Sequence, residues 1–521
     1  MDSEKSIDFL AKFTNFVMEK RSNDVFELIF DSENENYVIF NAMDLITFLC
    51  DFLNGNFVDD QFFDVSSQIL EHVIKIGKSK EILLAFIEFL NDKKLKDDQF
   101  FDLITRLLKI TFLRLPDQQL DSLEFILCKF YDHVTKFEFE NDDYDQQEFD
   151  SNVVENDQEF LISENWPSKK MLHYENSLKS TLNFLEIFVS ELKNCQIIKL
   201  SKFKNEKIKI LTSILLQFLS NPIIYFNLNT KIRSEKWFLV EKCVNFIYDL
   251  HPNGIFKIIE FPMLKFDHFA IGLLIVLVYC SQICQNRQPN VYSQDYIFRT
   301  CLVYCNALLQ YDDEFFWRSG LKLCKFLLQY EHVDYSHNCS PVFINLIKIM
   351  SETRSRIRRQ ESYDVFWQFL RKIDSQIQIS IFRKIFYCMG QNCFNEKLST
   401  QILYGIRGSI IDFYKWNLRI NVQNRQNIFW ANLRQFLPKF CQVSLLDDIL
   451  DQQEQIAACL NLFIFLNLNG DFNYNDQIDR YLENLKQAID ECKKSIDCDF
   501  SLCKLQFLSS LCDRLSEINN R

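Results

Sequence analysis

Apolar residues recur every three or four positions along most of the chain, which is the spacing of one face of an α-helix. Polar residues fill the positions between them, so each predicted helix has one face to bury. The spacing predicts helices throughout residues 7–134, 172–250 and 266–515, joined by short polar loops. Two of the apolar stripes consist of Leu120, Leu123, Leu127, Phe130 and Val134, and of Leu178, Leu182, Leu185, Val189 and Leu192.

A six-residue motif occurs twice. The sequence DDQFFD at residues 59–64 returns unchanged at 97–102, a period of 38 residues, and DFLN at 51–54 is answered by EFLN at 88–91. A third relative, DDEFF, occupies residues 312–316. We expect the leading aspartates to cap backbone N–H groups at a helix start, and the phenylalanines to begin the buried stripe.

A period near 38 residues built from two helices is typical of HEAT and armadillo repeats, in which each helix pair is covered by the next. Glycine and proline number only 9 and 8, which disfavours sheets with tight turns. The sequence therefore predicts an all-α, HEAT/armadillo-like helical-repeat solenoid. We expect N-terminal repeats in 1–136, central repeats in 168–338 and C-terminal repeats in 339–521.

The stretch 137–167 interrupts the helical pattern and is predicted to be a flexible acidic insertion. It holds eleven Asp or Glu and no Lys or Arg, so subtracting it from the net charge of −13 leaves −2 for the remainder. Such a segment either contacts a basic partner or is merely solvated. Because the rest is nearly balanced, we expect no nucleic-acid partner.

Cysteine usage and apolar runs indicate the environment. The 18 cysteines form no C-x-x-C pair, which favours reduced thiols in a cytoplasmic protein, with the nucleus also allowed. Cys280 and Cys284, like Cys301 and Cys305, are spaced to share a helix face. No signal peptide is evident. The longest apolar run, 269–280, is shorter than the ~20 residues of a membrane span, so we predict a buried helix and no membrane insertion.

Signatures of chemistry are missing from the sequence. It contains no P-loop, G-x-G-x-x-G, H-E-x-x-H or G-x-S-x-G motif. His332, His337 and Cys339 lie close together but lack the second ligand pair of a zinc site. We therefore expect no enzyme activity, no cofactor and no metal. An unrecognised enzyme or a thiol-dependent sensor remains an alternative.

A basic cluster precedes the helix predicted around Val365 and Phe369. Its members are Arg354, Arg356, Arg358 and Arg359. We expect a polar loop here, which either is simply solvated or contacts acidic protein or phosphate.

Several segments between about residues 80 and 490 occur in the order found in the glomulin family. The best stretch runs LLDDIL at 445–450, then IAACLNL at 456–462 and on to Leu466. FLP at 436–438 is similar to a break at the corresponding place, and KEILL at 80–84 resembles the start of a family helix. The chain thus resembles glomulin and its plant relative known for aberrant lateral root formation.

The resemblance implies a non-catalytic regulator. In that family the C-terminal repeats bind the RING-box subunit of a cullin-RING (SCF-type) ubiquitin ligase, with its cullin. They cover the surface on which the ubiquitin-conjugating enzyme lands, and so inhibit ubiquitin transfer. A helical-repeat adaptor of a transport or tethering complex is the alternative.

The family motifs do not fix individual contact residues, so candidates follow from chemistry in the matching region. Arg425, Trp430 and Arg434 are spaced to lie on neighbouring helical faces and are of types enriched at binding hot spots. Arg419 and Lys439 are further candidates. Trp430 has the alternative of a core position.

Overall fold

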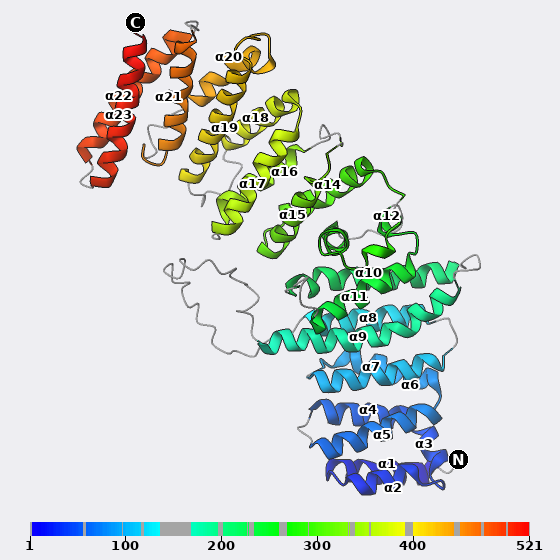
Figure 1. Cartoon of the computed structure of the whole chain (residues 1–521). Coiled ribbons are helices and arrows are strands. Elements are labelled where there is room, and N and C mark those ends of the chain that lie inside the picture. Colours follow the sequence, from blue (N-terminus) through cyan, green and yellow to red (C-terminus); the bar gives the residue numbers. More distant parts are fainter. Residues whose placement is uncertain are drawn as a thin grey trace. The chain divides into compact units, whose positions relative to one another are not determined.

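Every regular element in the described part of the chain is a helix, which confirms the all-α fold (Figure 1). The protein forms two compact units, Met1–Val291 and Tyr292–Arg521. The computed structural model describes residues 3–55, 59–95, 97–115, 119–135, 168–195, 202–226, 228, 234–259, 268–289, 291–331, 333, 339–353, 356–390, 400–441, 449–469, 474–495 and 499–519.

The first unit is built from two layers of helices. In one layer α4, α6, α8, α10 and α13 follow one another, and in the other α2, α5, α7, α9 and α11 do. Its helices are α1 (Ser3–Met18), α2 (Ser22–Phe30), α3 (Glu35–Phe40), α4 (Ala42–Gly55), α5 (Asp60–Ile76), α6 (Ser79–Asp92), α7 (Asp98–Leu113), α8 (Leu120–Thr135), α9 (Ser168–Cys195), α10 (Lys202–Ser220), η2 (Ile223–Tyr225), α11 (Glu235–Leu250), α12 (Ile255–Ile259), α13 (His268–Ile275), the π-helix η3 (Val276–Cys280) and η4 (Gln285–Arg287).

The second unit repeats the scheme. Helices α14, α16, α18 and α20 pack in sequence on one side, while α15 packs on α17 and α19 packs on α21, which contacts α23. Its helices are α14 (Gln294–Gln310), α15 (Glu314–Leu327), α16 (Ser340–Glu352), α17 (Arg356–Lys372), α18 (Ser375–Gly390), α19 (Thr400–Ile420), α20 (Ile428–Phe440), α21 (Gln453–Leu468), α22 (Asn475–Ser495) and α23 (Asp499–Asn519).

The repeated motif does begin helices as predicted. The Asp59 carboxylate accepts a hydrogen bond from the Phe62 N–H at 2.7 Å, and Asp97 accepts one from Phe100 at the same distance. These bonds satisfy amides that have no partner within the helix. The helix pair α4–α5 is thus repeated as α6–α7, with Phe62 buried at the equivalent position to Phe100.

The third copy of the motif is shifted by one residue. Asp313, the second aspartate of its pair, caps α15 by accepting from the Phe315 N–H at 2.8 Å. The buried aromatic pair is consequently Phe316 and Trp317 rather than Phe315 and Phe316. The third copy therefore keeps the capping aspartate and the apolar stripe that follows it. Aligning it with the first two copies by sequence places each structural position one residue too early.

The predicted apolar stripes form the core. All five residues of the stripe in α9 are buried, as are four of the five in α8, where Leu120 is only partly covered. The apolar run 269–280 is a largely buried helix, as expected, formed by α13 and η3. By length and composition, residues 203–225 could cross a membrane, but 56% of their most apolar 18-residue window is buried, and α10 packs against α8, α9 and α13.

Three local expectations were wrong. Cys284 lies beyond the helix that ends at Cys280, in a left-handed backbone conformation, so these two cysteines do not share a helix face. The arginines 356, 358 and 359 lie in the first turns of α17 rather than in a loop. The supposed break at Pro438 is inside α20, two residues before its end, so the proline removes one helical hydrogen bond and the helix ends within the same turn.

Some expectations concern residues beyond the described ranges. The acidic stretch 137–167, Arg354, and the group around His332 and His337 all lie outside them. The division expected at residues 338/339 falls within the second unit, where α14 packs on α16 and α15 on α17.

Candidate functional site

The five residues predicted to bind a partner surround the turn between α19 and α20. Arg419 is exposed near the end of α19, and Arg434 is exposed on α20. Lys439 is half-buried, with its ammonium 5.8 Å from the centre of the Phe436 ring. The structure therefore brings Arg419 and Arg434 to the surface and engages Lys439 with its own helix.

Arg425 precedes α20 instead of lying on it, because Asn427 caps that helix by accepting from the Phe429 N–H at 2.9 Å. It therefore does not lie on a helical face beside those of Trp430 and Arg434, and the prediction from their spacing was wrong for Arg425. Its Nη2 donates to the Asn469 carbonyl at 3.0 Å, at the C-terminal end of α21. A cation at this position satisfies a helix-end carbonyl and complements the helix dipole.

Basic side chains also donate to carbonyls at helix ends elsewhere in the protein. Arg114 donates to the carbonyls of Ile74 and Gly77 at the end of α5, the latter at 2.8 Å. Lys372 donates to the Leu328 and Tyr330 carbonyls after α15. Arg425 thus belongs to a set of basic residues that tie one helix end to a neighbouring segment.

Trp430 is buried, with 7% of its surface exposed. Its indole Nε1–H donates to the Asn421 carbonyl at 3.1 Å, and the Arg425 guanidinium lies 5.4 Å from its ring centre. The ring therefore packs between α20 and the preceding turn. Of the two positions that the sequence allowed for Trp430, the structure shows the core position.

A different tryptophan faces solvent. Trp416 of α19 is 52% exposed. Together with Arg419, Ile420 and Leu468, also exposed, it forms what we call the α19–α21 end surface. The buried stripe of α19 could have revealed it, because Ile410, Ile411, Tyr414 and Leu418 place Trp416 on the opposite side of the helix.

The packing of α19 and α21 explains why these side chains gather. Gly408 lies against the backbone of Glu454 near the start of α21, and Arg425, after the end of α19, reaches Asn469 after the end of α21. The two helices therefore run side by side in the same direction. Ile420 and Leu468, their last residues, therefore lie at the same end of the pair.

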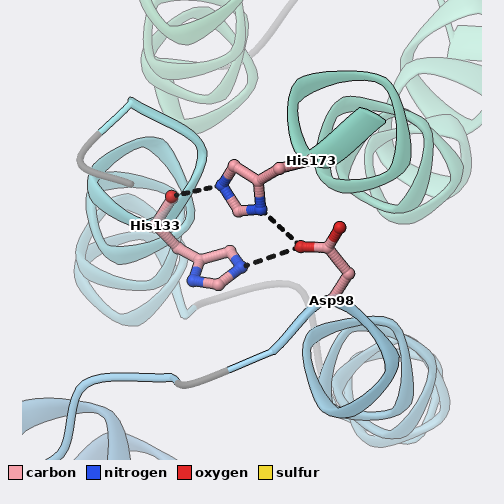
Figure 2. Close-up of side chains that lie close together, drawn as sticks. All are labelled: Asp98, His133 and His173. Atoms are coloured by element: carbon pink, nitrogen blue, oxygen red, sulfur yellow. Dashed lines mark hydrogen bonds and ion pairs between the residues drawn. The ribbon is translucent and has the colours of Figure 1, made fainter. Parts of the chain in front are cut away.

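A second group of side chains converges in the first unit, and sequence reasoning missed it. Asp98 at the start of α7, His133 near the end of α8 and His173 in α9 point toward one another (Figure 2). His173 Nδ1 is hydrogen-bonded to Asp98 Oδ1, and His133 Nε2 lies 4.0 Å from the same oxygen. The Ser177 Oγ donates to this oxygen at 3.2 Å.

The environment sets the protonation of this group. Burial, aided by the charge of His173, lowers the pKa of His133 to about 4, so its ring is neutral at pH 7. Burial alone raises the pKa of Asp98, but hydrogen bonds from His173 and Asn176 and the charge of His173 outweigh it and leave that pKa below its ordinary value. Asp98 is therefore an ionised carboxylate beside a neutral imidazole.

Spacing along the chain gave little signal for this group. Asp98 belongs to the second copy of the DDQFFD motif, but His133 and His173 lie on the consecutive helices α8 and α9, which residues 136–167 separate along the chain. The two histidines therefore meet through helix packing. A search for close neighbours along the chain selected His332, His337 and Cys339 instead.

A cavity of about 140 Å³ lies between α7, α8 and α9 in the first unit. Phe112, Leu123 and Phe188 contribute to its apolar wall, and its two charged lining residues, Lys207 and Glu191, pair with each other at 2.6 Å. The volume is well below the ~300 Å³ at which small-molecule sites usually begin.

Buried thiols are held in the protonated state. Cys305 and Cys324 bring their sulfurs to 3.1 Å, and the hydrogen bond between them, with burial, raises the pKa of Cys305. Burial likewise raises the pKa of Cys459. Thiols of this kind are poor nucleophiles, because the thiolate is the reactive form.

A scan against protein-family models found no family that matches this chain, and a search of curated proteins found no match either.

Proposed function

We propose that the protein is a non-catalytic regulator of the glomulin type, which binds the RING-box subunit of a cullin-RING ubiquitin ligase through its second unit. Bound there, it would cover the surface needed by the ubiquitin-conjugating enzyme and inhibit ubiquitin transfer by occupancy. The resemblance of residues 436–438 and 456–466 to that family supports the choice of partner.

The observation that carries the proposal is the α19–α21 end surface. Trp416 and Arg419 are of the two types most enriched at binding hot spots, and both are exposed one helical turn apart. Ile420 and Leu468 add exposed apolar area at the same end. An exposed tryptophan with apolar neighbours is costly in water, and burial under a partner removes that cost.

Rigid helix packing behind this surface suits a blocking function. Tyr414, on the opposite side of α19 from Trp416, is buried and donates its hydroxyl to the Phe429 carbonyl at 2.6 Å. A surface held in this way needs little ordering when a partner binds, so less of the interaction energy is lost. Blocking by occupancy needs no reacting groups, only an interface of roughly 1,200–2,000 Å².

The test is a binding and ubiquitin-transfer assay with the full-length chain and a purified RING-box–cullin pair. We expect a stable complex that slows ubiquitin transfer. Changing Trp416→Ala and Arg419→Ala together should weaken binding at least about thirtyfold, because truncating even one hot-spot residue costs about 2 kcal/mol or more.

Phe238→Ala is the matched control, because Phe238 is 54% exposed in the first unit and lies far from α19 in sequence. It should leave binding and inhibition unchanged. Failure of the wild-type chain to bind the RING-box–cullin pair would refute the proposed partner, and proteins co-purified with the chain would then test the transport or tethering alternative.

A further inference from the structure

The Asp98–His133–His173 group has an arrangement of donors and lone pairs that a cation would complete. The His173 Nε2–H donates to the His133 backbone carbonyl at 3.2 Å (Figure 2). His133 makes a backbone hydrogen bond with Leu95, and since its Nε2 has no hydrogen-bond partner, that bond uses Nδ1. Each ring therefore commits one nitrogen to a backbone carbonyl.

The remaining two nitrogens face the same carboxylate oxygen. His173 Nδ1, His133 Nε2 and an oxygen of Asp98 all lie within 4.8 Å of one another. In a ring whose other nitrogen donates to a carbonyl, the neutral form presents a lone pair, and a lone pair directed at a carboxylate is repelled. Only a cation between these atoms, either a proton or a metal ion, makes the arrangement favourable.

His133 shows that a proton on His173 does not satisfy the whole group. Its side chain is only 9% exposed, and its Nε2 is directed toward Asp98 without a hydrogen bond. Leaving a buried polar atom unsatisfied costs about 1–3 kcal/mol.

We propose that Asp98, His133 and His173 bind a divalent transition-metal ion of the zinc class. His173 Nδ1, His133 Nε2 and Asp98 Oδ1 are the three ligands, and water or the Ser177 hydroxyl occupies the fourth position. Two imidazoles and one carboxylate are a ligand set that zinc accepts. The carbonyls of His133 and Leu95 orient the rings, as backbone partners do for metal-binding histidines.

The consequence of binding is structural. The three ligands come from α7, α8 and α9, so the ion joins three helices of the first unit. Residues 136–167 separate α8 from α9 along the chain, and a contact that closes this long connection stabilises the fold by restricting the unfolded chain. On binding, the ion displaces the proton shared by His173 and Asp98, which is released to solvent.

The experiment uses the full-length chain, stripped with a chelator and then titrated with Zn²⁺ or Co²⁺. Co²⁺ reports the ligand type, because nitrogen and oxygen ligands give visible absorption without the thiolate charge-transfer band that any of the 18 cysteines would add. We expect the chain to bind one Co²⁺ ion, with the visible absorption of nitrogen and oxygen ligands and without the thiolate band. A hundredfold excess of Zn²⁺ over its dissociation constant should raise the unfolding temperature by about 5 °C.

Two variants and a matched control complete the test. Asp98→Asn, nearly isosteric, and His133→Gln should each weaken metal binding at least a hundredfold, whereas His251→Gln, which changes another buried histidine of the first unit, should leave it unchanged. The proposal would be overturned if the wild-type chain bound no Co²⁺ or bound it only with the thiolate band. The contact between His173 and Asp98 would then be an imidazolium–carboxylate pair without a metal. Should a variant not fold, the wild-type Co²⁺ spectrum still decides.

Discussion

At the scale of single residues, polar side chains satisfy backbone groups at the ends of several helices. Asp59, Asp97 and Asp313 each accept a hydrogen bond from an N–H group at a helix start. Arg114 and Lys372 donate to carbonyls at helix ends. A helix leaves these backbone groups without partners, so a chain made of many helices needs many such side chains. Aspartate and the basic residues complement opposite ends of the helix dipole.

A buried histidine gives the first unit a pH-dependent stability. His251 Nε2 lies 2.8 Å from the Thr212 Oγ1, and burial lowers the pKa of His251 to about 4 from its ordinary 6.5. The unfolded chain takes up a proton near pH 6.5, whereas the folded protein does so only near pH 4. The stability contributed by the neutral ring is therefore fully present above pH 6.5 and is lost as the pH falls toward 4.

We expect the free energy of unfolding to drop by on the order of 3 kcal/mol across this window because of His251. Urea unfolding at several pH values between 4 and 7 measures it. In the His251→Gln variant, the drop in the free energy of unfolding between pH 7 and 4 should be smaller by about that amount. The other histidines contribute equally to the wild type and the variant. Identical slopes for the wild type and the variant would contradict the assignment.

At the scale of elements, close approach of helix backbones determines where surfaces form. A Cβ on Gly408 would lie 2.8 Å from the Glu454 carbonyl oxygen, so only glycine allows α21 to approach α19 so closely. That contact brings the last residues of the two helices to one end of the pair, where Trp416, Arg419, Ile420 and Leu468 are exposed. The candidate binding surface therefore depends on a glycine that lies about two to three helical turns before the surface residues of α19.

Gly408→Ala should destabilise the second unit by up to about 2 kcal/mol, because overpacking against backbone costs about 1–3 kcal/mol while alanine favours a helix by only ~1. Chemical denaturation measures the change. Gly55→Ala in α4 is the control, since nothing lies within 4 Å of the Cβ it would add, and it should be neutral or slightly stabilising. Equal effects of the two substitutions would argue against the close packing of α19 on α21.

At the scale of the whole molecule, each helix contacts mainly its neighbours within its own unit. Helices α4 to α7 pack among themselves and on α2, α3, α8 and α9, while α19 to α23 do so in the other unit. Stability in such an architecture is a sum of local helix-pair terms, rather than the property of one central core. A destabilising substitution should therefore weaken the adjacent helices most, and helices further away in the chain should be less affected.

Leu70→Ala tests this locality, because Leu70 is fully buried in α5 and its truncation should cost about 2–5 kcal/mol. Hydrogen exchange followed by mass spectrometry should show faster exchange in α4 to α7 and unchanged exchange in α19 to α23. A uniform increase across both units would show that the chain unfolds as a single cooperative body.

The helical fold could be predicted from the sequence because it depends on local periodicity. The apolar stripes, the aspartate caps and the 38-residue repeat are properties of short segments, and each reappears in the structure with small shifts, such as the one-residue offset at Asp313. The glomulin-like function stays a prediction, which rests on the resemblance of short segments and on exposed residues of α19 and α21.

What only the tertiary structure decided is which side chains meet and which face water. The sequence left Trp430 open between the surface and the core, and the structure covers it with Arg425 and the turn that ends α19. Asp98, His133 and His173 converge only because three successive helices stack in a particular register. Local sequence determines the helices, but contacts between residues many positions apart depend on how those helices pack, and packing is set by side chains on both partners at once.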